Sequence, residues 1–318
     1  MNYIIVDLEW NQNPNGKGSE KEKLPFEVIE IGAVKLQDEG KILEEFHSYI
    51  KPQVYLELHY KTQELLNINI KELKNQKYFT EVITEFFQWC GEDYAFCTWG
   101  SMDLTELQRN LAYYDKLALL PGPIRYYDVQ KLFSLQYEGV KNPHTLEYAV
   151  DYLGLDKQDV FHSAIHDARY TAVILSKLEK RILSNFSIDC YQNPQSKEEE
   201  IYIVYDKYSK YISKEYNTKE ELIQDKDITS TVCYQCGKRA VKKIKWFSNN
   251  TKNYYCLAYC RKHGFIKGKL RLKKTDSDHF YAIKILKQVD ETEAAAIQKR
   301  QQDIKHRKKE KRAKKANK

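Results

Sequence analysis

The first ten residues, MNYIIVDLEW, constrain what this chain can fold into more than any other stretch. The apolar run from Tyr3 to Val6 predicts a buried strand, and it leads directly into two acids, Asp7 and Glu9. Side chains two residues apart on a strand point to the same face of a sheet, so both carboxylates face one spot. Two like charges at the end of an apolar strand repel each other and resist desolvation, which favours a cation between them.

Further acids and a histidine follow in a definite order. Asp103 lies between a strand-like run, 94–98, and a helix-like run, 104–114. His162 comes just before a long helical segment, and Asp167 lies in the first turns of that segment. The ordered set D-x-E, D, H-x4-D resembles the DEDDh family of 3′–5′ exonucleases, which have a ribonuclease H-like fold.

The resemblance covers about residues 1–185 and extends beyond the acids. Residues 27–34, EVIEIGAV, resemble the second strand of that family. The motif Trp99-Gly100-x-x-Asp103 and residues 145–155 resemble the bacterial sporulation-inhibitor and eukaryotic histone-mRNA and RNAi exonucleases. Ser163 occupies the position at which a sister family has the Tyr of its Y-x3-D motif, which disfavours that sister family.

The resemblance implies an enzyme that hydrolyses single-stranded nucleic acid to 5′-nucleotides with two Mg²⁺ or Mn²⁺ ions. Hard divalent cations prefer carboxylate oxygens. By matching position, Asp7 is implied to bridge the two ions and Glu9 to hold the ion nearer the attacking water. Asp103 and Asp167 are implied to complete the coordination, and His162 to act as the general base.

Four further residues lie close in sequence to these acids or in the resembling segments. His166 is a weaker candidate for the base, because it is adjacent to Asp167 on a helix rather than facing the same cleft. Glu30 is interpreted as an acid at the sheet edge or beside the ligands, and not as a ligand. Trp10 is predicted to stack on the 3′-terminal base. Asn11 departs from the usual D-x-E-x-T form, which affects a sugar contact made by that Thr.

Charge is distributed unevenly along the chain. Residues 1–227 contain 26 Lys or Arg and 38 Asp or Glu, whereas residues 228–275 contain 13 Lys or Arg and no acid. Such a cationic block attracts polyanions by counterion release, and it predicts a nucleic-acid-binding region. The residues predicted to contact substrate there are Lys243, Lys245, Trp246, Lys269 and Arg271.

No apolar run approaches the ~20 residues of a membrane helix. Asp7 and Glu9 also interrupt the apolar N-terminal segment where a secretory signal would lie. We therefore expect a cytoplasmic protein without a membrane partner.

Four of the seven cysteines lie close together near the C-terminus, within residues 233–260, and His263 follows them. Without a secretory signal, this spacing favours a metal over disulfides. The segments Cys233-x-x-Cys236-Gly and Cys260-x-x-His263-Gly have the same form, and together they resemble a zinc ribbon with a closed, structural Cys₃His site. Cys256 remains an alternate to Cys260 or His263.

The prediction is an α/β protein with a ribonuclease H-like mixed sheet flanked by helices in residues 1–185. A charged connector is expected over 186–230, and a small, β-rich, zinc-ribbon-like basic module that binds nucleic acid over 231–288. A basic tail, disordered or helical, is expected over 289–318. RNA is the favoured substrate and DNA the alternative. Two other functions stay open: a DNA-directed proofreading-like or trimming exonuclease, and a catalytically inert nucleic-acid-binding regulator.

Overall fold

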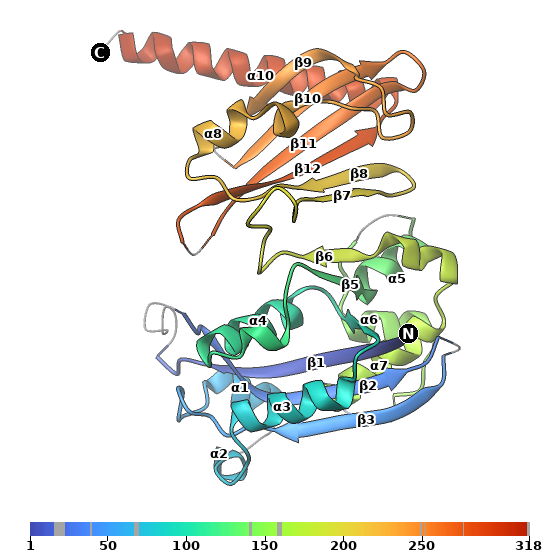
Figure 1. Cartoon of the computed structure of the whole chain (residues 1–318), viewed down its shortest axis with the longest axis vertical. Helices are drawn as coiled ribbons and strands as arrows, with labels where there is room; N and C mark the ends of the chain where they lie inside the picture. Colours follow the sequence, from blue (N-terminus) through green and yellow to red (C-terminus); the bar gives the residue numbers. More distant parts are fainter. Residues whose placement is uncertain are drawn as a thin grey trace. The chain divides into compact units, whose positions relative to one another are not determined.

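The computed structural model describes residues 1–318 except 16–22, 39, 67–69, 140–141, 158–160, 249, 251, 276 and 317–318. The chain forms two compact units, Met1–Gln192 and Asn193–Lys318. Each unit is built on one six-stranded sheet (Figure 1). Among the described helices, none combines the length and the apolar character that crossing a membrane requires.

The sheet of the first unit is mixed. Its strands are β1 (Asn2–Gln12), β2 (Phe26–Leu36), β3 (Ile42–Tyr49), β4 (Tyr94–Thr98), β5 (Ile124–Asp128) and β6 (Ser187–Asp189), in the order β3-β2-β1-β4-β5-β6. Strand β1 runs antiparallel to β2 and parallel to β4. The predicted α/β class with a mixed sheet is therefore confirmed.

Helices cover both faces of this sheet (Figure 1). They are α1 (Tyr60–Leu66), α2 (Ile70–Leu73), α3 (Phe79–Cys90), α4 (Met102–Tyr113), α5 (Val129–Tyr137), α6 (Leu146–Tyr152) and α7 (Ala164–Ser176), with short 3-10 turns at Leu117–Leu119 and Lys180–Asn185. Ile4, Val6 and Leu8 of β1 pack with α3 and α4. Tyr3 and Ile5 pack on the other face with α5 and α7. Burial of both faces explains the nearly continuous apolar run before the acids.

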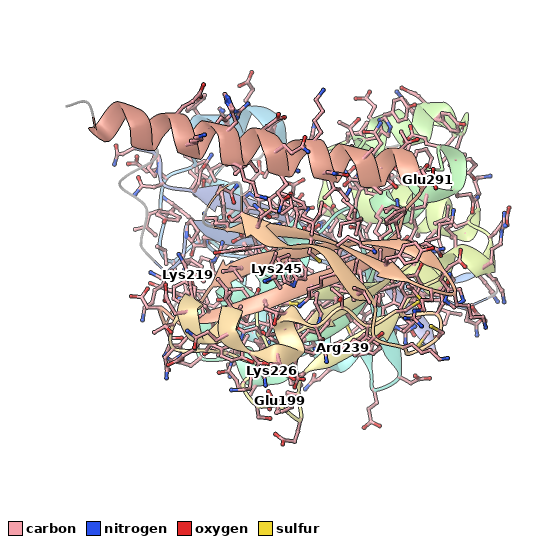
Figure 2. All side chains as sticks on the ribbon, turned by 90° about the horizontal axis from the view of Figure 1, so that it is seen from above. Glu199, Lys219, Lys226, Arg239, Lys245 and Glu291 are labelled. Atoms are coloured by element: carbon pink, nitrogen blue, oxygen red, sulfur yellow. The ribbon has the colours of Figure 1, made fainter. Side chains whose placement is uncertain are left out.

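The sheet of the second unit is antiparallel. Its strands are β7 (Ile201–Val204), β8 (Tyr208–Ile212), β9 (Val241–Ser248), β10 (Asn253–Cys260), β11 (Gly264–Lys274) and β12 (Phe280–Gln288), in the order β7-β8-β12-β11-β10-β9. Helices α8 (Lys219–Gln224) and α9 (Lys226–Thr229) pack on one face through Leu222 and Ile228. Helix α10 (Glu291–Ala316) packs on the other face through Ala294 and Ile297. Figure 2 shows this helix on the opposite side of the sheet from α8 and α9.

The prediction of a connector over 186–230 is wrong. Its first residues form β6, which completes the first sheet, and β7 and β8 belong to the second sheet. These strands are only three to five residues long, and β6 and β7 are the edge strands of their sheets. Pairing with a neighbouring strand, rather than a long apolar pattern in the sequence, therefore defines them. The tail is the helix α10 because Ala294, Ile297 and Ile304 are buried. Its last two residues, 317–318, lie outside the described residues.

Candidate active site

Asp7 and Glu9 lie on the face of β1 that packs against α7. Ile5 shares this face, and it packs with Ile165 and Ala168 of that helix. Across the β1–β2 pairing, Asp7 lies opposite Gly32 and Glu9 opposite Glu30. The two acids therefore point from the middle of the sheet toward the start of α7.

Asp103 comes from helix α4 and contacts the same strand, β1. It lies in the first turn of α4, is 6% exposed, and its Oδ1 accepts a hydrogen bond from the main-chain N–H of Leu8 at 3.2 Å. The turn before α4 requires glycine at position 100, where φ is +100°. The hydroxyl of Thr98 donates to the Gly100 carbonyl at 2.6 Å and fastens this corner. Asp103 is thus attached to β1 between the two acids.

His162 and Asp167 come from the start of α7. The main-chain N–H of His162 donates to Oδ2 of Asp167 at 3.3 Å. His162 is exposed and has φ of +67°, an uncommon conformation for a bulky residue that is found mostly at functional sites. One ligand atom each of Glu9, His162 and Asp167 lies within 4.8 Å of the others. His166 is not part of this group.

Burial, together with the charges of neighbouring carboxylates, raises the pKa of all four acids. Burial, followed by the charges of Glu30, Asp167 and Asp103, raises the pKa of Glu9 to about 8. Burial raises the pKa of Asp103 to about 7 and that of Asp167 to about 6. Burial and the charge of Asp103 raise the pKa of Asp7 well above its ordinary value. Ionising all these acids together near neutral pH therefore requires a compensating cation.

The site has the donors that a hard divalent cation takes. All four acids offer carboxylate oxygens, and no thiol is among them. Oδ1 of Asp167 is buried and has no hydrogen-bond partner among the described residues. A bound cation would satisfy this oxygen, so the residues fit the predicted metal.

These shifts predict that the metal-free protein loses stability as pH rises from about 4 to about 8. A carboxyl group whose folded pKa is raised binds more protons in the folded state over that interval, so deprotonation favours unfolding. Added Mn²⁺ should raise the thermal midpoint more at pH 8 than at pH 6. Thermal unfolding of metal-free and Mn²⁺-loaded protein measures both effects, and Glu9→Gln should flatten the pH dependence. A Mn²⁺ effect that is the same at both pH values contradicts the prediction.

Comparison with known proteins identifies the first unit. Residues 4–175 match the exonuclease family (RNase T), and this span contains all four acids and His162. The chain belongs to the exonuclease family. The order Asp7, Glu9, Asp103, His162 and Asp167 is that of its DEDDh branch, whose members are 3′–5′ exonucleases. The predicted family, fold class and enzyme class are therefore confirmed.

Three relatives illustrate the extent of the likeness. The exonuclease is 29% identical over 179 residues to "Probable 3′-5′ exonuclease KapD" of Bacillus subtilis (strain 168), which covers 55% of this chain and 82% of KapD. It is 30% identical over 158 residues to "DNA polymerase III PolC-type" of Thermotoga petrophila (strain ATCC BAA-488), covering 46% of this chain but 10% of the polymerase. Its structure is similar to the nuclease domain of 3′hExo, a DEDDh family member bound to rAMP, with a TM-score of 0.49 and 20% identity over 59% of this chain and 96% of that domain.

Two residues after the acids hold the end of β1 in this exonuclease. Asn11, at the position of the usual Thr, is fully buried; its Oδ1 accepts from the N–H of His59 at 2.9 Å. Its amide group donates to the carbonyls of Tyr55 and Glu57. Trp10 is half-buried, and its ring lies 5.8 Å from that of Phe26. The stacking of Trp10 on a terminal base stays a prediction.

Glu30 is predicted from the sequence to lie at the sheet edge or beside the ligands, and Gly32 has no predicted role. Glu30 is completely buried and lies opposite Glu9, rather than at an exposed sheet edge. Gly32 lies directly against the first residues of α7. Both belong to the segment EVIEIGAV, whose likeness to the second strand of the family was the one sequence signal for these positions. The period-2 alternation of this segment predicts a strand, but it does not predict the contact with α7.

The second unit brings four of the predicted zinc ligands together. The ligand atoms of Cys233, Cys236, Cys260 and His263 all lie within 4.8 Å of one another. Sγ of Cys236 is 3.7 Å from Sγ of Cys260, and Nδ1 of His263 is 3.3 Å from Sγ of Cys233. A tetrahedral zinc with bonds of about 2.0 to 2.3 Å separates its ligand atoms by similar distances.

Cys256 lies outside the four-ligand group. It is fully buried on β10 beside Gly268, and burial raises the pKa of its thiol to about 12. By contrast, hydrogen bonding from the main chain of Lys262 lowers the pKa of the Cys260 thiol to about 6. Of Cys256 and Cys260, Cys260 is therefore the cysteine suited to bind a cation as a thiolate.

The residues predicted to contact substrate in the second unit are not all on one face. The side chains of Lys243, Lys245, Lys269 and Arg271 are exposed. Trp246 is half-buried: its ring packs beside Gly268 and its Nε1–H donates to the Thr229 carbonyl at 2.8 Å, so its contact with substrate stays a prediction. Trp246 was predicted from its basic neighbours, but pairing turns it inward toward α9.

Proposed function

We propose that this exonuclease hydrolyses single-stranded nucleic acid from its 3′ end to 5′-nucleotides, with RNA favoured over DNA. The observation that supports this most strongly is the convergence of Glu9, His162 and Asp167 beside Asp7 and Asp103. These four acids would hold two Mg²⁺ or Mn²⁺ ions. When bound, such ions generate a nucleophile from water at neutral pH and stabilise the charge on the leaving oxygen.

The protein's own groups supply positioning and proton transfer. The exposed imidazole of His162 can take the proton of the attacking water. The main-chain N–H of His162 donates to Asp167, and this hydrogen bond keeps the imidazole beside the acids. Asp103 is held by the N–H of Leu8, so its carboxylate stays in place as substrate arrives and leaves.

Product analysis of RNA and DNA oligonucleotides tests this function. Matched oligonucleotides labelled at either end would be incubated with Mg²⁺ or Mn²⁺, and RNA should shorten from its 3′ end faster than DNA. EDTA-treated, metal-free buffer should abolish the reaction, and full activity there contradicts the proposal. Faster degradation of DNA favours the proofreading-like or trimming alternative. Tight binding without turnover in Mn²⁺ favours the inert regulator.

We also propose that Cys233, Cys236, Cys260 and His263 hold one structural Zn²⁺. Four protein ligands close the site and leave no position for substrate, which is the arrangement of a structural zinc. Gly237 and Gly264, with φ of +67° and +77°, let the chain curl behind each ligand pair. The ion would fasten the loop before β9 to the turn between β10 and β11.

Zinc content separates the cysteines of this site from Cys256. The purified full-length protein is expected to contain one zinc per chain by mass spectrometry. Cys236→Ser should lose the metal and lower the thermal midpoint, because an open site binds zinc weakly. Cys256→Ser, a matched buried cysteine, should retain one zinc. Full zinc content in the Cys236 variant, or loss in the Cys256 variant, contradicts the assignment.

The second unit is further proposed to bind the nucleic-acid backbone. The six strands β7 to β12 carry 11 Lys or Arg and no Asp or Glu. Lys269 and Arg271 alternate with Leu270 and Leu272 on β11, and both leucines are buried beneath α8 and α9. The two cations therefore point to the opposite face of the sheet. There they can contact phosphates and raise the local concentration of substrate.

The salt dependence of binding tests this surface. Neutralising Lys269 and Arg271 together (Lys269→Gln with Arg271→Gln) should weaken RNA binding and reduce the slope of log K against log salt by about 1.4, as expected for two lost phosphate contacts on a single strand. The control neutralises Lys219 and Lys226, which Figure 2 labels on α8 and α9 across the sheet, and should leave the slope unchanged. Equal slopes for the Lys269 variant and the wild-type protein contradict the proposal.

A further inference from the structure

Glu30 on β2 is a buried acid beside the candidate active site that has no role in the mechanism above. Its side chain is 1% exposed, and it lies opposite Glu9 in the β1–β2 pairing. A buried carboxylate is costly unless it is paired or hydrogen-bonded. The partners of Glu30 therefore indicate what it does.

One oxygen of Glu30 anchors the beginning of α7. Oε1 accepts from the main-chain N–H of Ala164 at 3.1 Å and from the Ser163 hydroxyl at 3.3 Å. His47 on β3 holds the same oxygen through Nε2 at 2.9 Å. Ala164 is the first residue of α7, and the N-cap residue Ser163 makes no capping hydrogen bond with its own side chain. Glu30 therefore supplies, from a neighbouring strand, the acceptor and negative charge that a helix N-terminus favours.

Gly32 brings the two backbones into direct contact. A Cβ at this position would lie 2.1 Å from the carbonyl carbon of Ala164 and 2.1 Å from the nitrogen of Ile165. No side chain fits there, so the first turn of α7 rests on the main chain of β2. His162 lies two residues before Ala164, and Asp167 lies three residues after it. The contact between β2 and Ala164 therefore determines the positions of the His162 imidazole and the Asp167 carboxylate.

The other oxygen of Glu30 acts through its charge. Oε2 is buried and has no hydrogen-bond partner in the described part of the chain. After burial, the charge of Glu30 contributes most to raising the pKa of Glu9, and it also raises the pKa of Asp167. The negative charge of Glu30 thus acts on Glu9 and Asp167, the two acids that lie beside His162.

We propose that Glu30 is a positioning residue that holds the start of α7, and through it His162 and Asp167, in the geometry that binds the divalent cation. Its unpartnered oxygen adds negative potential on the Glu9 side of the site. This inference rests on the proposed metal-dependent function. It assigns Glu30 no direct contact with substrate.

Three full-length variants test the role of Glu30. Glu30→Gln keeps an acceptor for Ala164 but removes the charge, and Ser163→Ala removes one hydrogen bond to the same oxygen without touching the core. The matched control is Glu27→Gln. Glu27 lies on the same strand, is 2% exposed, and accepts from the N–H groups of Gln53, Val54 and Tyr55, away from α7.

Glu30→Gln should lower kcat by about 10- to 100-fold with KM for a labelled RNA oligonucleotide unchanged, which is the usual cost of losing a group that orients metal ligands. Its affinity for Mn²⁺ alone, measured by electron paramagnetic resonance without substrate, should fall about 10-fold. Ser163→Ala should show a smaller loss in both quantities. Glu27→Gln should lower only the thermal midpoint.

The inference is overturned if Glu30→Gln and Ser163→Ala retain wild-type kcat and Mn²⁺ affinity. It is also overturned if Glu27→Gln reduces them equally, because the effect would then be general destabilisation. The measurement of Mn²⁺ affinity needs no turnover, so it tests Glu30 even if the wild-type protein hydrolyses nothing. A wild-type protein without hydrolytic activity would count against the proposed function alone.

Discussion

Asp7→Asn is expected to lower the rate of nucleotide release by more than about 1,000-fold, because stabilisation of transition-state charge by metal ions is worth several kcal/mol. The same change should raise the thermal midpoint of the metal-free protein at pH 8. Burial, followed by the charges of Asp103, Glu9 and Asp167, disfavours ionised Asp7 there, and a neutral amide of the same shape removes that cost. Loss of activity together with a gain in stability excludes unfolding as the cause.

Asp128→Asn is the control for this result. Asp128 is also buried, but it caps α5 by accepting from the N–H of Lys131, a role that Asn fulfils equally well. Its activity should equal that of the wild-type protein. If Asp7→Asn retains more than a tenth of wild-type activity, Asp7 does not hold a catalytic cation.

His162→Asn is expected to lower kcat by about 100- to 10,000-fold, the usual contribution of a general base. Asn tolerates the left-handed backbone that His162 adopts, with φ of +67°, so the loop should keep its conformation while losing the imidazole. Mn²⁺ affinity and KM should change little.

His166→Asn separates the two histidines. His166 precedes Asp167 directly but lies outside the group formed by Glu9, His162 and Asp167. This variant should retain wild-type kcat and its pH profile. If His166→Asn is inactive and His162→Asn is active, the assignment of the base is reversed.

The placement of the four proposed metal-binding acids could be predicted partly from local rules and partly from their order along the chain, which resembles that of a known family. Period-2 alternation on β1 puts Asp7 and Glu9 on one face, and helix starts place Asp103 and Asp167 in first turns. The role of Glu30 could not be read in this way. It depends on α7, more than 130 residues later in the chain, resting on Gly32.

The second unit was harder to predict for the same reason. Trp246 and Lys269 both lie in a basic segment, but strand pairing turns the tryptophan toward α9 and the lysine to the opposite face. Strands β7 and β8 carry little apolar alternation, and pairing with β12 defines them. The grouping of Cys233, Cys236, Cys260 and His263 was the exception, since two matching Cys-x-x-Cys/His-Gly turns are a local signal.

The most direct measurement is an anomalous-diffraction map from crystals grown with Mn²⁺. The account predicts two manganese peaks bounded by the carboxylates of Asp7, Glu9, Asp103 and Asp167, with the imidazole of His162 beside them. Crystals of Asp7→Asn should lack at least one peak. Absence of any manganese among these four acids in the wild-type crystals would contradict the central claim.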